Sequence, residues 1–401
     1  MSRHNYLYGG FTMKLVLSDP VVVASGPESA TTGWGVYQFP DIERLADGRL
    51  MIAFADSADT IDAYGAERGC YVSSDEGKTW EKANERSLDP LRGLLLDNGE
   101  RVQFIEQDSV SIPEGTQLPP VVCKRGNYSY HLAEEMPESL CSRDWVIHRI
   151  SKEHPEGADE VAKLNWPNML IRTGSGILVP PQPWGRLRKD ADGVLWMPTF
   201  NGGMDPLTGE YTSYLNVYLL KSVDNGHTWD LVNTLVYRPE EHLDDFLAYD
   251  REGYNENNIT FAPDGSLIRL VRSDGAFSRV KGTLYLTRST DKGLTWSDPV
   301  PFDDRGVWPQ LLTLDCGVTL ATYGRPGFFI RATEDPACLN WEERIRLIPD
   351  GTRMHKTTCS YSDMIALDDH TAGLVYTDFT VKDANGVARK TVLFRTVSVE
   401  K

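Results

Sequence analysis

Short apolar runs alternate with polar turns along almost the whole chain, and several of these turns contain Asp-Gly. Residues 47–48, 192–193 and 264–265 are Asp-Gly pairs, and each separates two short apolar runs. Such a pair between alternating runs indicates a β-hairpin, because Gly accepts the positive φ that a tight turn requires. Helical periodicity is scarce. Residues 132–164 show the most, and we expect a loop or an edge insertion there. The pattern predicts an all-β protein.

One octapeptide recurs three times with the shared pattern Ser-x-Asp-x-Gly-x-Thr-Trp. The copies span residues 73–80, 222–229 and 289–296, and a weaker fourth copy spans 333–341. In each copy we expect the Asp to accept backbone N–H bonds across a tight turn, the Gly to adopt a positive φ and the Trp to anchor the next strand in the core. We therefore interpret the copies as hairpin turns and not as catalytic motifs.

The two kinds of turn alternate, and their order predicts the architecture. A strand, an Asp-Gly turn, a strand, a longer connection, a strand, an octapeptide turn and a strand make a four-stranded antiparallel unit, as in a propeller blade. Units of about 65 residues would give six blades in one domain of 401 residues. We expect the N-terminal strand to close the last blade, and residues 1–12 to be an extension ahead of Met13. The predicted blades span residues 30–85, 90–165, 166–235, 252–300, 304–350 and 355–401.

Composition and charge narrow the function classes. The chain has 41 Lys and Arg against 58 Asp and Glu, a net charge of −17 that would repel nucleic acids and anionic membranes. No run approaches the ~20 apolar residues of a membrane-spanning helix, and the N-terminus does not read as a signal peptide, so we expect a cytoplasmic protein. The six cysteines are scattered without zinc-site spacing. We therefore expect reduced thiols and neither a metal nor a cofactor.

The octapeptides and their placement give the chain a resemblance to the sialidase (neuraminidase) superfamily. Members of this superfamily are six-bladed propellers, and they carry this repeat as the Asp box. The resemblance covers nearly the whole chain. It implies a carbohydrate partner and a central active site with three arginines for the substrate carboxylate, a Tyr nucleophile with a Glu partner, and an Asp acid/base. Because sialic acid carries a carboxylate at its anomeric carbon, a neutral Tyr suits the attack better than a carboxylate would.

The resemblance carries over to four residues in the second half of the chain. The segment 359–364 is similar to the nucleophile segment and gives Tyr361 that role. Glu256, followed by a hairpin that ends at Arg272, is similar to the segment that supplies the partner Glu and the second arginine. Arg325 stands where the third arginine is expected.

Two positions depart from the family pattern. Gln38 occupies the place of the first arginine, and the loss of a charged hydrogen bond would cost on the order of 1.5–3 kcal/mol of carboxylate binding. The acid/base loop has no arginine but three aspartates. Asp62 fits the spacing best, while Asp59 and Asp56 remain alternatives, and burial would raise the pKa of such an acid.

Trp184 is a candidate for stacking on the sugar beyond the cleaved bond, or else part of a blade core.

These residues favour an exo-glycoside hydrolase that removes a terminal sugar, with an acidic sugar as the first candidate. Two alternatives remain open: a glycan-binding propeller without hydrolysis, and a lyase or hydrolase that acts on a different sugar. On an acidic protein with a few inward-facing arginines, we also expect the central pocket to be the positive spot.

Overall fold

Strands make up nearly all of the regular structure. The computed structural model describes residues 13–60, 68–83, 93–140, 143–238, 252–273, 284–352 and 356–400. A short 3-10 helix, η3 (Ala133–Glu135), interrupts the strands. Within the described ranges, no helix has the length and apolar character needed to cross a membrane. The expected extension at residues 1–12 lies outside the described residues. The all-β prediction is confirmed.

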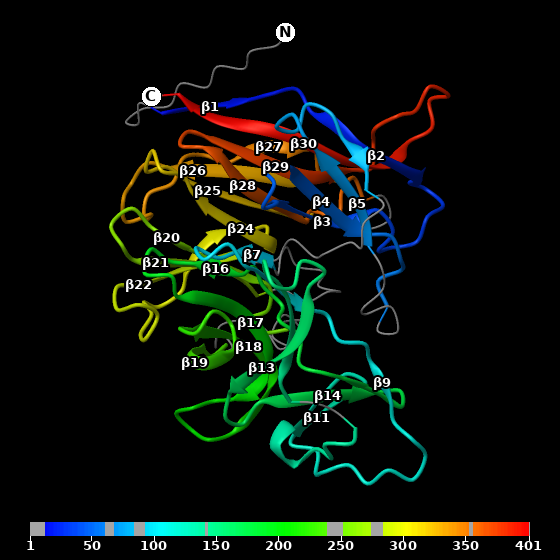
Figure 1. Cartoon of the computed structure of the whole chain (residues 1–401), viewed down its shortest axis with the longest axis vertical. Coiled ribbons are helices and arrows are strands. Elements are labelled where there is room, and N and C mark those ends of the chain that lie inside the picture. The colour runs from blue at the N-terminus through cyan, green and yellow to red at the C-terminus, as the bar shows by residue number, and fades with distance from the viewer. Residues whose placement is uncertain are drawn as a thin grey trace.

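Three sheets are four-stranded antiparallel meanders in which spatial order follows chain order (Figure 1). Their innermost strands contact one another in succession, together with those of the neighbouring sheets. The strands are β3 (Gln38–Arg44), β4 (Leu50–Ala55), β5 (Arg68–Ser73) and β6 (Glu81–Lys82); β20 (Asn257–Phe261), β21 (Leu267–Arg272), β22 (Leu284–Ser289) and β23 (Val300–Asp303); and β24 (Val307–Thr313), β25 (Thr319–Gly324), β26 (Phe328–Thr333) and β27 (Ile345–Ile348).

An eight-stranded sheet consists of two such units joined by a parallel pairing of β13 with β19. Its strands are β7 (Gly93–Leu95), β8 (Arg101–Ile105), β12 (Trp145–Ile150) and β13 (Ala158–Asn165), then β16 (Arg188–Lys189), β17 (Leu195–Met204), β18 (Tyr211–Ser222) and β19 (Thr228–Leu235). Residues 132–164, expected to be a loop or edge insertion, therefore supply two full strands. In β12 buried and half-buried residues alternate, the period of a strand and not of a helix.

The N-terminal strands complete the last sheet. β28 (Ser362–Asp368), β29 (Thr371–Asp378) and β30 (Arg389–Glu400) form a meander, and both β1 (Lys14–Leu17) and β2 (Val21–Glu28) pair with β30. Figure 1 shows β1 lying along β30. The predicted closure by the N-terminal strand is confirmed, with two strands in place of one.

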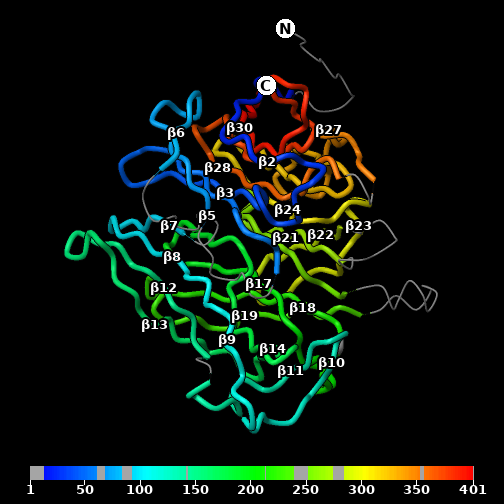
Figure 2. Tube along the Cα trace, turned by 90° about the vertical axis from the view of Figure 1, so that its right-hand side faces the viewer, coloured from blue at the N-terminus to red at the C-terminus, as the bar shows by residue number. Residues whose placement is uncertain are grey.

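A further sheet was not anticipated from the sequence. It contains β9 (Val110–Ser111), β10 (Cys123–Arg125), β11 (Tyr128–Leu132), β14 (Leu170–Gly174) and β15 (Ile177–Val179). We call it the inserted sheet, because its strands come between those of the eight-stranded sheet. It lies at the end of the molecule farthest from β1 and β30 (Figures 1 and 2).

The octapeptide turns share one set of hydrogen bonds. In the copies at residues 73–80, 222–229 and 289–296, the Asp accepts from the Thr backbone N–H at 2.9 Å. In the same three copies the Gly has a positive φ of 83°, 92° and 81°, and the Trp indole N–H donates to the Gly carbonyl. In the fourth copy, Trp341 donates in the same way to Cys338 at 2.8 Å. The predicted hairpin role is confirmed.

Two arginine side chains, the buried Arg186 and the half-buried Arg188, connect the inner strands. Arg186 donates to the carboxylate of Asp363 in β28 and, at 3.1 Å, to the carbonyl of Ile42 in β3. Arg188 donates to the carbonyl of Leu311 in β24 and, at 3.1 Å, to Asn258 Oδ1 in β20. Burial, with some help from the like charge of Arg186, lowers the pKa of Arg188 to about 9. Through these bonds, the segment before β17 connects strands of four other sheets.

Replacement of Asp363 by Asn should destabilise the protein by about 3–5 kcal/mol, because it leaves the buried Arg186 without its counter-charge. Denaturant unfolding monitored by tryptophan fluorescence measures the free energy. Asp315→Asn, at an exposed turn, is the matched control and should change stability by less than about 0.5 kcal/mol. Equal losses in the two variants would contradict the assigned role of the ion pair.

Candidate active site

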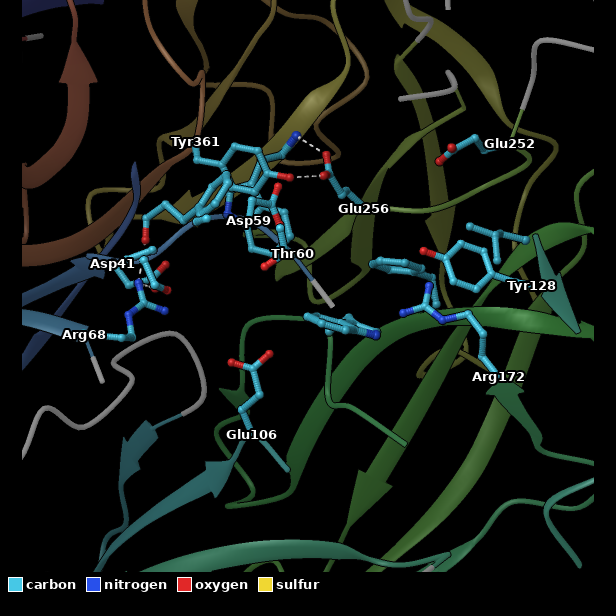
Figure 3. A pocket seen from close by; sticks show the side chains of 18 of the residues that line it. Asp41, Asp59, Thr60, Arg68, Glu106, Tyr128, Arg172, Glu252, Glu256 and Tyr361 are labelled. Carbon is cyan, nitrogen blue, oxygen red and sulfur yellow. Dashed lines mark hydrogen bonds and ion pairs between the residues drawn. The ribbon is translucent and has the colours of Figure 1, made fainter. Parts of the chain in front are cut away.

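A cavity of about 370 Å³ lies between the inner strands and the inserted sheet (Figure 3). This is within the range of about 300–1,000 Å³ that is usual for small-molecule sites. Tyr361, Glu256, Asp59 and Trp184 all line it, so the structure brings four of the predicted site residues together. They come from four separate stretches of the chain, which the arrangement of the sheets brings together.

Glu256 receives donors on both carboxylate oxygens. Tyr361 Oη donates to Oε1, while Oε2 accepts from Arg272 Nη1 at 2.6 Å and from the backbone N–H of Trp308 at 2.8 Å. Glu256 comes directly before β20, and Arg272 ends the next strand, so the hairpin itself places the ion pair. Trp308 has a φ of 46°, an unusual value that turns its backbone at this point of β24.

Aromatic rings fix the plane of Tyr361. The Trp308 ring stacks on it with centroids 4.7 Å apart and an interplanar angle of 19°, and Phe39 meets it edge-on at 4.6 Å. The guanidinium of Arg325 lies 5.8 Å from the ring centre. These contacts leave the tyrosyl ring little rotational freedom and hold its hydroxyl on Glu256.

The two partners have opposite pKa shifts. Burial raises the pKa of Tyr361 well above its usual value, and the neighbouring negative charge of Glu256 adds to this. Burial also acts to raise the pKa of Glu256, but Arg272, the Tyr361 hydrogen bond and Arg325 together outweigh it and lower that pKa. At neutral pH the proton therefore resides on Tyr361 and the negative charge on Glu256.

Asp59 lies on an exposed loop, and its side chain lines the cavity. Its backbone N–H donates to the carbonyl of Trp34 at 3.1 Å. Gly35, with a φ of 106°, makes this approach feasible, since a Cβ there would stand 2.3 Å from the Asp59 nitrogen. Desolvation raises the pKa of Asp59 despite a hydrogen bond from Trp34 and the charge of Arg325. A proton donor in the cavity needs this direction of shift.

Of the other two aspartates considered for the acid role, Asp62 lies outside the described residues. Asp56 does not line the cavity. Its charge acts instead on the Tyr37 and Tyr71 hydroxyls, whose pKa values burial raises first and Asp56 raises further. Among the described candidates, Asp59 is thus the aspartate at the cavity.

Neither of the two predicted arginines is among the residues that line the cavity. Arg272 is buried and binds Glu256. Arg325 donates to the carbonyl of Cys359 at 2.8 Å, and its guanidinium stacks 4.9 Å from the Trp34 ring. Each arginine thus donates to a protein group, although Arg325 Nε has no hydrogen-bond partner.

Gln38 is not brought to the cavity. It is fully buried, and in the amide orientation that its neighbours require, its oxygen accepts from Lys390 Nζ at 2.9 Å. Tyr37 and Phe39, on either side, have positive φ values, and the β3–β4 register shifts after Gln38. Such an irregularity re-aims side chains, so Phe39 lines the cavity in place of Gln38.

Trp184 and Glu106 share one stretch of the cavity wall. The buried amide of Gln182 accepts from the backbone N–H of Gln107 at 3.2 Å and donates to the Gln107 carbonyl at 2.7 Å, which joins the two loops. The Trp184 ring stacks against Phe200, with centroids 6.1 Å apart at an angle of 20°. The wall therefore offers an aromatic surface beside a carboxylate.

The cavity lining is not the positive spot that the sequence suggested. Its described part holds five carboxylates and three arginines, and two of the arginines are paired, Arg68 with Asp41 at 2.7 Å and Arg125 with Glu252 at 3.2 Å. Among the described residues, no group of three or more His, Cys, Asp or Glu side chains is arranged to hold a metal ion.

The sequence analysis did not identify the cavity residues of the inserted sheet, since the repeat carries no signal for them.

Solved structures resemble this chain in fold. A protein of unknown function from Dyadobacter fermentans has a TM-score of 0.63 at 15% identity, over 96% of this chain and 99% of that chain. An α-L-arabinanase from Penicillium chrysogenum complexed with arabinobiose has 0.54 at 13%, over 94% and 98%. The Hadza microbial sialidase Hz136 has 0.53 at 16%, over 91% and 65%. No protein-family profile and no curated protein matches the sequence. These likenesses support an all-β fold of the propeller type.

Replacement of Asp59 by Asn should change how stability depends on pH. A raised pKa means that the folded state holds the proton more tightly, so wild-type stability falls as pH rises from the unfolded value near ~3.9 through the raised pKa. The Asn variant lacks this loss. Its free energy of unfolding, relative to wild type, should therefore increase between pH 3 and pH 7.

Denaturant unfolding at a series of pH values measures this difference. Asp298→Asn, at an exposed position outside the cavity, is the control and should run parallel to wild type. A parallel curve for Asp59→Asn would show that its carboxyl group titrates as in the unfolded chain.

Proposed function

We propose that this protein is an exo-acting glycoside hydrolase that uses Tyr361 as nucleophile and Glu256 as its base. The observation that carries the proposal is the hydrogen-bonded pair in the cavity, with the proton on Tyr361 and the charge on Glu256. The sugar-processing enzymes among the similar structures, an arabinanase and a sialidase, support a carbohydrate substrate.

The proposed scaffold is a single domain of six four-stranded blades. The three separate meanders account for three blades, the two halves of the eight-stranded sheet for two, and β28–β30 with the N-terminal strands for the sixth. The buried ion pair between Glu43 in β3 and Arg101 in β8, at 2.6 Å, joins the first and second of these units. A closed ring would bring the start of each inner strand to one central cavity.

In the first step, the Tyr361 oxygen attacks the anomeric carbon while its proton passes to Glu256. Asp59 donates its proton to the glycosidic oxygen, and the bond to the leaving sugar breaks with its electron pair on that oxygen. A sugar covalently bound to Tyr361 results. The raised pKa of Asp59 suits a group that must carry a proton into this step.

In the second step, Asp59 takes a proton from water, and the resulting hydroxide oxygen attacks the anomeric carbon. The bond to Tyr361 breaks, and its oxygen regains the proton from Glu256. Two displacements at one carbon imply retention of configuration. The scheme uses no cofactor. Asp62 stays an alternative proton donor.

Arg272 and Arg325 act in this proposal as positioning residues. Arg272 keeps Glu256 charged, and Arg325 stacks beside Tyr361 and Trp34. If the terminal sugar is acidic, their positive charge would also attract its carboxylate, the role that the family resemblance implies.

A neutral terminal sugar is the second candidate, and one observation favours it. Arg272 donates to Glu256 and Arg325 to the Cys359 carbonyl, and neither lines the cavity; Phe39 lines it in place of Gln38, which stands at the family's first arginine position. A site built in this way has fewer free donors for a carboxylate at the anomeric carbon.

Tyr361→Phe should abolish turnover of an aryl glycoside that wild type hydrolyses, and Glu256→Gln should lower kcat by about 100- to 10,000-fold, the usual contribution of a general base. Steady-state kinetics with released nitrophenol measure both. Tyr376→Phe, in the core of the last sheet, is the matched control for loss of a hydroxyl and should retain activity. Full activity in Tyr361→Phe would rule out the mechanism.

A panel of aryl glycosides should separate the candidates for the terminal sugar. If the acidic sugar is correct, the sialoside gives the highest kcat/KM, and Arg325→Gln lowers it by raising KM. If the neutral sugar is correct, an arabinoside or other neutral glycoside gives the highest value. Glycan binding without turnover on any substrate would instead favour a non-hydrolytic propeller.

A further inference from the structure

The inserted sheet forms the cavity wall that faces the Tyr361–Glu256 pair. Arg125 of β10, Tyr128 and Tyr130 of β11 and Arg172 of β14 all line the cavity from this side. Figure 3 shows Tyr128 and Arg172 together, apart from Tyr361 and Glu256. A ligand whose terminal sugar is held at Tyr361 would extend its remaining part toward this wall.

Arg172 is a cation held in place without an anion. Its guanidinium carbon lies 4.7 Å from the centre of the Tyr128 ring, and its strand pairs directly with β11. Among the described residues, the Arg172 side chain has no ion pair and no hydrogen bond. An arginine held over an aromatic ring keeps N–H groups available, and these can bind an oxyanion through two parallel bonds.

Among the residues that the structure describes, no carboxylate pairs with Arg172. Glu252, the carboxylate on this wall, is paired with Arg125 at 3.2 Å and also accepts from Asn255 Nδ2 at 3.1 Å. Glu106, which follows β8 and shares a stretch of the lining with Trp184, makes no hydrogen bond or ion pair with Arg172. Tyr130 packs on Gly202, where any Cβ would come within 2.8 Å of its ring, and its hydroxyl adds a neutral donor beside the arginine.

A small cavity of about 50 Å³ adjoins the main one on this side. Arg172, Tyr130, Trp184 and Phe200 line both this cavity and the main one. Stacked aromatic rings next to a cation suit a sugar ring that carries a negative group, because the C–H face can pack on the rings while the oxyanion meets the arginine.

We propose that Arg172 is the anion-binding residue of a subsite for the leaving group, and that this subsite takes a sugar bearing a carboxylate or a sulfate. The inference rests on the proposed function, which supplies the direction of the substrate in the cavity. It assigns to the inserted sheet the selection of the leaving sugar and to the inner strands the cleavage.

Direct binding tests the subsite without hydrolysis. Isothermal titration of wild type with methyl glucuronide, methyl glucoside and methyl glucoside 6-sulfate should give tighter binding of the anionic sugars. The stronger of the two anionic ligands identifies the preferred group. Arg172→Gln should weaken the anionic sugars by about 10- to 100-fold and leave methyl glucoside within about twofold. Arg346→Gln, at an exposed position of β27, removes the same charge elsewhere and should change nothing.

Arg172→Lys keeps the charge without the planar donor pair, and we expect it to bind the anionic sugars more weakly than wild type does. Arg172→Lys also tests the subsite if Arg172→Gln does not fold. Equal binding of all three sugars to wild type, or unchanged anionic binding in the folded Arg172 variants, would overturn the subsite.

Kinetics separate this inference from the proposed function. With disaccharides that differ only in the leaving sugar, wild type should prefer the anionic one, and Arg172→Gln should remove the preference. Turnover that depends on Tyr361 but ignores the leaving-sugar charge overturns the subsite alone. Anion binding that depends on Arg172, with full activity in Tyr361→Phe, supports the anion site and overturns the mechanism alone.

Discussion

The buried ion pair between Arg186 and Asp363 is the interaction on which the rest of this structure depends. A buried pair of charges adds little net stability, because desolvation offsets most of the attraction. Once both charges are buried, however, removal of either partner strongly destabilises the fold. The pair therefore restricts which strands can face each other at the centre. Arg186 adds a bond to Ile42, so β3 and β28 are held by one guanidinium. Asp363 follows Tyr361 by two residues, and the same constraint therefore positions the candidate nucleophile.

Glu256 repeats this logic at the cavity. Its carboxylate is buried, and three donors from separate strands and loops satisfy it: Arg272, Tyr361 and the backbone of Trp308. Because the donors outweigh desolvation, the carboxylate stays charged, and its charge in turn helps to keep the Tyr361 proton in place. A tyrosine in this state is inert toward solvent, yet its proton has an acceptor already within hydrogen-bonding distance when an electrophilic carbon arrives.

Local patterns predicted the elements well and the site only in part. Each octapeptide is a self-contained turn, so its hydrogen bonds follow from eight residues, and the Asp-Gly hairpins are equally local. Tyr361 and Glu256 could be named because the short segments around them resemble the family's nucleophile and partner segments. Gln38 could not be placed, since its burial depends on positive φ at both neighbours and on Lys390 from the far end of the chain. The strands β12 and β13 were missed because the polar positions of a half-exposed strand hid the alternation.

The inserted sheet was missed for a different reason, and that reason bears on function. A repeated motif can predict only the features that all units share. Here these are the turns and strands of the scaffold that unites the inner strands. The wall facing the pair is built by residues outside the repeat, from Arg125 to Arg172, where nothing in the pattern constrains them. Such a wall can change without disturbing the buried charges at Asp363 and Glu256. Under the proposed function, this division would let the residues of the inner strands keep the cleavage chemistry while the inserted sheet sets the choice of ligand.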